Sequence, residues 1–176
     1  QHMFANVLVG NTWTGPMQLD RAPDGGSNNF NVNGRVITWR EGNVTRALAT
    51  WSRRLGNANT QTEWATFSSA TMTWTAPAVV ANAGRLAVTP AGRVLTLWTA
   101  SDAVYAGTFE NGAWSLGTTP IMQLAEEADI ELAASADGTA MALVAYQDDG
   151  VEDPVYAIRY DGAAWGAPVQ IGALTD

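Results

Sequence analysis

The stretch Tyr156-Ala-Ile-Arg-Tyr-Asp-Gly-Ala-Ala-Trp165 runs directly into Gly-Ala-Pro-Val-Gln-Ile171. Its first five residues are rich in aromatic and β-branched side chains, which favour extended backbone. Asp161-Gly162 is a turn pair, and a second apolar segment follows from Trp165. The stretch therefore predicts two antiparallel strands joined by a tight turn.

The same Trp-led segment occurs four times, beginning at Trp13, Trp74, Trp114 and Trp165. An aromatic pair precedes three of them: Trp64/Phe67, Tyr105/Phe109 and Tyr156/Tyr160. Further upstream in each repeat, a turn glycine separates two more apolar segments; these glycines are Gly42, Gly92 and Gly138. One repeat is therefore expected to contain four short strands.

The proposed repeats are 35–83, 85–124 and 128–173, and residues 4–20 supply only the last two strands of a further unit. Four-stranded units of about 40–50 residues are typical of β-propeller blades. The sequence predicts an all-β fold, a β-propeller or partial propeller of about three and a half four-stranded antiparallel blades. A β-sandwich is the rival architecture, and the fixed four-strand period favours the propeller.

The run 156–165 resembles blades of two propeller families, the sialidase-like group with Asp-box turns and the small fucose-binding lectins. The resemblance spans roughly residues 35–173, with Asp161-Gly162 the best match and Glu110-Asn111-Gly112 a looser one. The glutamate that the lectin blades carry before the turn is replaced here by Ala157 and Gly107. No sialidase-like set of Arg cluster, Tyr nucleophile and acid Asp can be assigned, so the resemblance implies a scaffold rather than an activity.

Composition excludes several kinds of site. The chain has 176 residues, 47% of them apolar, and no cysteine, which rules out disulfides, Cys nucleophiles and Cys-based metal centres. Residues 1–3, Gln-His-Met, read as an expression scar, so we expect no native histidine and no His-based triad or metal site. Lysine is absent too, which leaves Ser and Thr without their usual activating bases. An enzyme is therefore the less favoured reading.

The charge and hydropathy of the chain restrict the classes of partner that it is expected to bind. Nine arginines against seventeen acidic residues give a net charge of -8, which predicts no nucleic-acid partner because phosphate backbones would be repelled. No apolar run approaches the roughly 18 residues of a membrane span, so we expect no membrane insertion. The alanine-rich, lysine-free composition suggests a bacterial source, and a secreted or cell-surface location is favoured.

Alternating strand directions place the longer loops on one face of the predicted fold, which makes that face the candidate binding surface. Trp51, Trp98 and Tyr146 fall near the ends of the second strands and could stack on sugar rings, or could pack between blades. Arg53 and Arg54 open the segment 52–63 and could hold an anionic ligand, or could be ordinary exposed arginines.

Acidic residues gather in two loops of the last repeat. Such clusters can supply the six to eight oxygens that Ca²⁺ requires, and they can equally form a solvated acidic rim. A paired-carboxylate glycosidase site is a weaker alternative, since nothing sets the separation of the carboxylates. The candidate calcium ligands are Glu126, Glu127, Asp129, Asp148, Asp149, Glu152 and Asp153.

These observations predict a non-catalytic binding module that presents loops and aromatic rings to a glycan or protein ligand. Two alternatives stay open: a structural repeat segment of a larger bacterial surface protein, and a fragment of a sialidase-like propeller hydrolase. An incomplete ring would leave open sheet edges, so we also expect either self-association into a homo-oligomer or flanking blades in a parent protein.

Overall fold

The structure is a computed structural model that describes residues 2–9, 11–20, 30–55, 59–124, 128–146 and 153–174. It divides into two compact units, Gln1–Asn82 and Ala83–Asp176, which are described separately below. Every regular element in the described ranges is a β-strand. The described part of the chain accordingly has no helix that could cross a membrane.

The first unit begins with an interrupted hairpin, called here the N-terminal hairpin. It consists of β1 (Phe4–Ala5), β2 (Leu8–Val9), β3 (Thr12–Trp13) and β4 (Met17–Gln18). Strand β1 pairs with β4 and β2 pairs with β3, both antiparallel. Backbone hydrogen bonds from Thr14 N to Val7 O and from Leu19 N to Met3 O continue the pairing beyond the strands.

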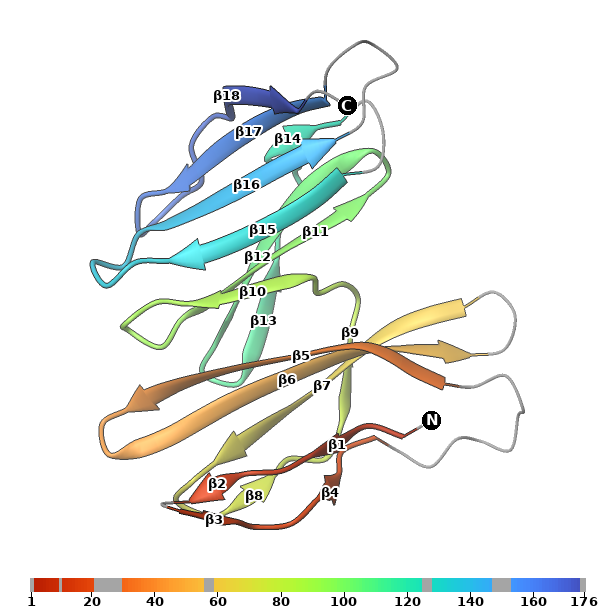
Figure 1. The fold of residues 1–176 in the computed structure, drawn as a ribbon, viewed down its shortest axis with the longest axis vertical. Coiled ribbons are helices and arrows are strands. Elements are labelled where there is room, and N and C mark those ends of the chain that lie inside the picture. The colour runs from red at the N-terminus through yellow and green to blue at the C-terminus, as the bar shows by residue number, and fades with distance from the viewer. Residues whose placement is uncertain are drawn as a thin grey trace. The chain divides into compact units, whose positions relative to one another are not determined.

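The rest of the first unit is one antiparallel sheet, the first sheet. Its strands are β5 (Phe30–Glu41), β6 (Val44–Leu55), β7 (Asn59–Ser68), β8 (Thr73–Trp74) and β9 (Ala78–Val80). They pair in sequence order from β5 to β8, and β9 also pairs with β7. Strands β8 and β9 are therefore two pieces of one edge strand. Figure 1 shows the long β5, β6 and β7 in orange and yellow.

The second unit contains two sheets with the same order of strands. The second sheet consists of β10 (Arg85–Val88), β11 (Val94–Ala100), β12 (Ala103–Glu110), β13 (Ala113–Leu116) and β14 (Met122–Gln123), with β13 and β14 both pairing with β12. The third sheet consists of β15 (Ala128–Ala134), β16 (Ala140–Tyr146), β17 (Asp153–Tyr160) and β18 (Val169–Leu174). An isolated bridge between Tyr160 and Trp165 precedes β18.

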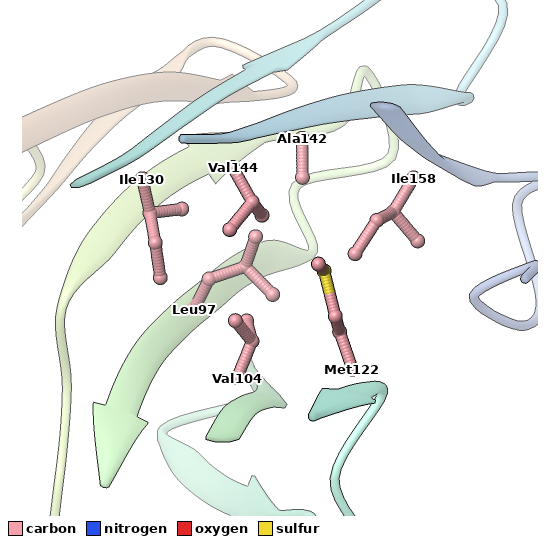
Figure 2. Close-up of a cluster of buried hydrophobic side chains, with 7 residues drawn as sticks. All are labelled: Leu97, Val104, Met122, Ile130, Ala142, Val144 and Ile158. Atoms are coloured by element: carbon pink, nitrogen blue, oxygen red, sulfur yellow. The ribbon is translucent and has the colours of Figure 1, made fainter. Parts of the chain in front are cut away.

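The core of the second unit lies between its two sheets. In β16, Ala140, Ala142 and Val144 are buried while the residues between them are exposed, the period-two pattern of a strand with one covered face. Figure 2 shows the interlocked side chains: Leu97, Val104 and Met122 from the second sheet, and Ile130, Ala142, Val144 and Ile158 from the third. Full burial of each valine, leucine or isoleucine contributes about 1.5–3 kcal/mol.

A separate core joins the N-terminal hairpin to the first sheet. Leu19 of the hairpin packs with Ala49 and Trp51 of β6 and Ala65 of β7. Three partly buried residues, Met3, Ala5 and Trp74, complete this cluster. The hairpin is thus a short second layer on the first sheet, held by its inward-facing apolar residues.

A proline interrupts the last strand of every repeat. Pro77 lies between β8 and β9, and Pro120 lies between β13 and β14. Pro16 and Pro168 occupy the corresponding places before β4 and β18. Because proline has no N–H to donate, the ladder stops there and resumes one or more residues later.

The expected all-β class is confirmed, with several antiparallel sheets in the described residues. The described ranges contain no closed barrel or propeller ring, so the propeller stays a prediction. The segment 52–63, expected on the loop face, belongs mostly to β6 and β7, and β5 already begins at Phe30. Residues 59–63 are all polar, and Thr60 and Thr62 favour extended backbone although the segment has no apolar face.

Candidate functional site

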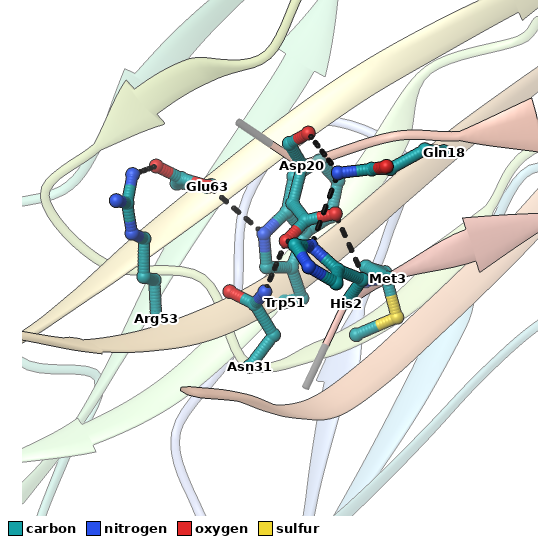
Figure 3. A network of polar contacts seen from close by, with 8 residues as sticks. All are labelled: His2, Met3, Gln18, Asp20, Asn31, Trp51, Arg53 and Glu63. Carbon is teal, nitrogen blue, oxygen red and sulfur yellow. Dashed lines mark hydrogen bonds and ion pairs between the residues drawn. The ribbon is translucent and has the colours of Figure 1, made fainter. Parts of the chain in front are cut away.

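The polar centre of the first unit is a buried carboxylate, Glu63 on β7. Its Oε2 accepts a hydrogen bond from Trp51 Nε1 at 3.0 Å, and its Oε1 accepts one from Arg53 Nη1 at 3.1 Å. The Arg53 and Glu63 side chains are only 7% and 3% exposed. A third donor, Gln61 Nε2, lies 3.3 Å from Oε1. Figure 3 shows the Trp51–Glu63–Arg53 part of this network.

Strand geometry explains why these residues meet. Trp51 and Arg53 are two residues apart on β6, so their side chains leave the same face. Glu63 stands directly opposite Trp51 in the β6–β7 register. An ion pair this deeply buried is tolerated only when hydrogen bonds satisfy both charges, and three donors meet that need for the carboxylate.

A second buried carboxylate, Asp20, ties the N-terminal hairpin to β5. Its Oδ1 accepts the Met3 backbone N–H at 3.0 Å, and its Oδ2 accepts Asn31 Nδ2 at 2.5 Å. His2 Nδ1 lies 3.2 Å from Oδ2. Asn31, which donates to Asp20, stands opposite Arg53, which donates to Glu63, in the β5–β6 register. The Asp20 and Glu63 carboxylates therefore belong to one polar cluster.

A cavity of about 330 Å³ opens beside this cluster, bounded by the N-terminal hairpin and the first sheet. Its size is at the small end of ligand pockets. Buried Trp74 Nε1 finds no hydrogen-bond acceptor among the described residues. An indole N–H without an acceptor costs free energy, and an oxygen-bearing ligand would supply one. The lining residues are Met3, Phe4, Ala5, Asn6, Leu19, Gly34, Arg35, Val36, Ala49, Thr50, Trp51 and Trp74.

The aromatic residues expected to form a stacking platform are mostly buried. Trp51 is 1% exposed and Trp98 is 8% exposed. Trp98 stacks on Tyr105 with ring centroids 5.8 Å apart, and Tyr146 stacks on Tyr156 at 5.9 Å. Their role as sugar-binding rings stays a prediction.

The two candidate arginines lie in different environments. Arg53 is buried against Glu63, whereas Arg54 is exposed near the end of β6. Of the predicted ligand-binding residues, Trp51 and Arg53 therefore lie together in one cluster of the first unit. Trp98 and Tyr146 belong to the second unit and have other ring partners.

Most of the predicted calcium ligands lie outside the described residues: Glu126, Glu127, Asp148, Asp149 and Glu152. Asp129 and Asp153 are described, at β15 and at the start of β17. Within the described ranges, no group of three or more acidic or histidine side chains is arranged to hold a metal ion. The calcium site stays a prediction.

Sequence reasoning missed Glu63 and Trp74 as partners in this site. Glu63 falls in the segment 52–63, for which no strand pairing was expected, and the β6–β7 register sets it directly opposite Trp51. Trp74 was recognised only as the first residue of a Trp-led segment. Its ring contacts Phe67, at 5.5 Å between centroids, and the residue lines the cavity, while its N–H has no acceptor among the described residues.

The second unit has electrostatic contacts of a different kind. Arg93 Nη1 donates to Tyr160 Oη at 3.1 Å and its Nε donates to Glu110 Oε2 at 3.1 Å, and these hydrogen bonds raise the pKa of Arg93. In the turn after Tyr160, Asp161 Oδ1 accepts the backbone N–H groups of Ala164 and Ala163, which lowers the pKa of Asp161. These contacts hold turns and sheets together.

Comparison with known proteins gives a structural likeness alone. No protein-family model matches the chain, and no curated protein matches it either. Two solved structures are similar. One is described as a polysaccharide lyase of family PL25, an ulvan lyase, with a TM-score of 0.54, 10% identity, and coverage of 98% of this chain and 50% of that one.

The other is an ulvan lyase of the same family bound to -[GlcA(1-4)Rha3S]-, with a TM-score of 0.50, 10% identity, and coverage of 93% and 47%. The chain thus spans about half the length of these relatives. At 10% identity the likeness concerns the fold. It does not confirm the resemblance to sialidase-like or fucose-binding blades. What it shows is that this chain shares an all-β architecture with carbohydrate-active proteins.

Proposed function

We propose that this chain is a carbohydrate-binding β-sheet module, non-catalytic in itself, which holds part of a glycan in the cavity between the N-terminal hairpin and the first sheet. The observation that carries the proposal is the cavity itself, about 330 Å³, whose wall includes Trp74, an indole whose Nε1 has no hydrogen-bond acceptor among the described residues. The likeness in fold to two polysaccharide lyases, one bound to a saccharide, supports the choice of ligand class.

The lining suits a sugar. Phe4, Trp51 and Trp74 offer apolar ring surface to the C–H groups of a pyranose. Asn6 and Thr50 add side chains that can exchange hydrogen bonds with hydroxyl groups. Trp74 Nε1 donates to a ring or hydroxyl oxygen of the ligand.

The charge of the preferred glycan is the finer part of the proposal. Arg35 in the lining could pair with a uronate or sulfate group, the groups found in the saccharide bound by one of the similar lyases. The net charge of -8 opposes a long polyanion. We therefore expect short oligosaccharides with at most one acidic group to bind best.

The test is calorimetric titration of the full chain with neutral and uronate-containing oligosaccharides, using Trp74→Phe as the informative variant. Losing one neutral hydrogen bond is expected to weaken binding roughly 2- to 10-fold. The melting temperature should fall only slightly, because phenylalanine keeps a ring against Phe67 and the lost N–H has no acceptor among the described residues. Trp165→Phe, in the second unit and away from the cavity, is the matched control and should bind like the original protein.

Three results would overturn the proposal in different ways. Equal affinity of Trp74→Phe and the original protein would remove the cavity from the binding site. Absence of glycan binding at millimolar concentration would favour a structural role. Release of shortened or unsaturated sugars would replace the binding role by catalysis.

A further inference from the structure

A glycine interrupts the long strand β5 at the wall of the cavity. Gly34 lies inside this strand, where glycine is unfavourable because it loses much backbone entropy on folding and has no side chain to pack. The backbone does not require glycine here, since Gly34 is not one of the glycines with a positive φ angle. The reason for a glycine at this position therefore lies in the space around it.

A β-bulge surrounds Gly34. The register of β5 against β6 shifts between Val32 and Arg35. Asn33 and Gly34 therefore stand together opposite a single residue of β6, Trp51. Asn33 has a φ angle of 55°, in the left-handed region that asparagine adopts more readily than most residues. Because Gly34 and Trp51 both line the cavity, the bulge places bare backbone at the cavity wall beside Trp51.

The space above Gly34 is shared with the N-terminal hairpin. A Cβ placed on Gly34 would lie 3.0 Å from Met3 Cε and 3.2 Å from Met3 Sδ. Both atoms are at the end of a flexible, unbranched side chain, which can turn aside without moving the backbone. Met3 belongs to the segment 1–3, expected to be an expression scar, so it serves here only as a reporter of the space above Gly34.

The Trp51 side of the cavity has no such freedom. Trp51 is 1% exposed, and its Nε1 donates to Glu63 Oε2 at 3.0 Å. Close packing and this hydrogen bond hold the ring in one position, because moving it would leave a buried polar pair unsatisfied. A group added at position 34 therefore takes its room from the Met3 side chain or from a bound ligand.

Given the glycan-binding function proposed above, on which this step rests, we propose that Gly34 is a specificity-determining residue of the cavity. Without a side chain at this position, a sugar ring lies directly on the backbone of the bulge. A bulge leaves its extra residue outside the ladder, so peptide groups there can exchange hydrogen bonds with sugar hydroxyls. The ligand class is thereby narrowed to sugars that are compact on the edge facing Gly34, and a large substituent there, such as an acetamido group, is excluded by its size.

A purely structural glycine would behave differently when it is replaced. If Gly34 served the fold alone, a larger residue would lower the melting temperature and leave the affinity of the folded protein for glycan unchanged. If Gly34 serves the cavity, alanine lowers the affinity while the melting temperature changes little, because the flexible end of Met3 absorbs the clash. Affinity and melting temperature together therefore separate the two roles.

The first experiment is calorimetric titration with the same neutral and uronate-containing oligosaccharides. Gly34→Ala should weaken the oligosaccharide that binds most tightly by roughly 10-fold, the effect of one methyl group on the fit of a pocket. Gly172→Ala, in a strand of the second unit where a Cβ meets nothing within 4 Å, is the matched control and should bind like the original protein.

Two further comparisons test the shape of the ligand. Adding Met3→Ala to Gly34→Ala should recover most of the lost affinity, because the shorter side chain returns the space. The N-acetylated counterpart of the same oligosaccharide should bind the original protein more weakly than the parent sugar, and Met3→Ala should narrow that difference. An N-acetylated sugar that binds as well as its parent would overturn the preference for a compact ligand.

The second experiment follows the methionine methyl signals by NMR, and its first step needs no glycan. Gly34→Ala should shift the signal of Met3 and leave that of Met141, in the second unit, in place. Adding the oligosaccharide to the original protein should again shift the Met3 signal and leave the Met141 signal unchanged.

The possible failures of the two proposals differ. Glycan binding that Gly34→Ala leaves unchanged, or that does not move the Met3 signal, would overturn the role of Gly34 while the protein still binds glycan. A melting temperature that falls sharply in Gly34→Ala with no change in affinity would make Gly34 a structural residue. A Met3 signal that moves in Gly34→Ala, without binding of any oligosaccharide at millimolar concentration, would overturn the glycan-binding function itself and the role of Gly34 with it.

Discussion

At the scale of single residues, the structure buries two tryptophans in two different ways. Trp51 and Trp98 both lie on the second strand of their sheets, and each stands directly opposite one residue of the third strand. For Trp98 that residue is Tyr105, and the two rings stack. For Trp51 it is Glu63, which takes the indole N–H and the Arg53 guanidinium. The repeat therefore preserves the strand pairing while the chemistry of the pair changes.

Glu63→Gln should destabilise the first unit by about 3 kcal/mol, because it leaves the Arg53 charge buried without its carboxylate. Chemical denaturation followed by tryptophan fluorescence measures the change. The double variant Arg53→Met with Glu63→Gln removes the stranded charge and should recover part of the loss. A double variant less stable than the single one would show that the ion pair is not the source of the effect.

Asp161 should make stability depend on acid pH. The N–H groups of Ala164 and Ala163 hold the pKa of Asp161 below its ordinary value, so its ionised form stabilises the folded state at pH values above that ordinary value. This contribution is lost as pH falls through the lowered pKa, below about pH 4.

Asp161→Asn tests this dependence, because asparagine keeps an Oδ1 acceptor but cannot titrate. The original protein should be the more stable of the two at pH 6, and their difference in unfolding free energy should shrink between about pH 4 and 2. Asp137, whose pKa is also lowered, chiefly by hydrogen bonds from Thr139, is present in both proteins and cancels. A difference that does not change with pH would contradict the assignment.

At the scale of strands and turns, close backbone contacts set where a side chain can be added. Gly84 precedes β10, and a Cβ placed on it would collide with the carbonyl oxygen of Leu97 on β11. Gly84→Ala should therefore cost about 1–3 kcal/mol, as overpacking does. Gly172→Ala in β18 meets no atom and should change stability by less than about 0.5 kcal/mol. Thermal unfolding of the two variants gives the comparison, and equal losses would refute it.

The turns were the most predictable elements. Gly42, Gly92, Gly138 and Gly162 were expected at tight turns, and all four have positive φ angles, between 59° and 102°. Positive φ is a local requirement that glycine meets without a Cβ clash. A glycine at a predicted turn therefore indicates positive φ without any knowledge of tertiary contacts. The Trp-led repeat likewise predicted strands in sequence order, because each strand pairs with the next one along the chain.

The extents of β5 and β7 and the cavity were less predictable. Residues 59–63 are all polar, and only Phe30 and Val32 are apolar in 30–34, so neither segment shows the apolar alternation that marks a half-buried strand. The cavity depends on how the hairpin of residues 4–18 packs on Ala49 and Trp51, a contact between distant segments. Strand periodicity carries no information about such packing.

At the scale of the whole molecule, the net charge of -8 should make association of copies depend on salt. Raising ionic strength shortens the Debye length from about 30 Å at 0.01 M to about 3 Å at 1 M. Repulsion between copies is then screened, while any apolar contact between them is not weakened. The dissociation constant measured by sedimentation should fall as salt rises, whereas an ion-paired contact would show a rising constant.

The prolines that break the last strand of each repeat limit the ways in which copies can join. A strand arriving at the edge formed by β8 and β9, or by β13 and β14, would find no continuous row of donors, because Pro77 and Pro120 supply none. Fibril growth of the cross-β kind requires such a row, since each new chain hydrogen-bonds along the whole length of the last. The proline-bearing edges of the first and second sheets therefore resist becoming templates for amyloid.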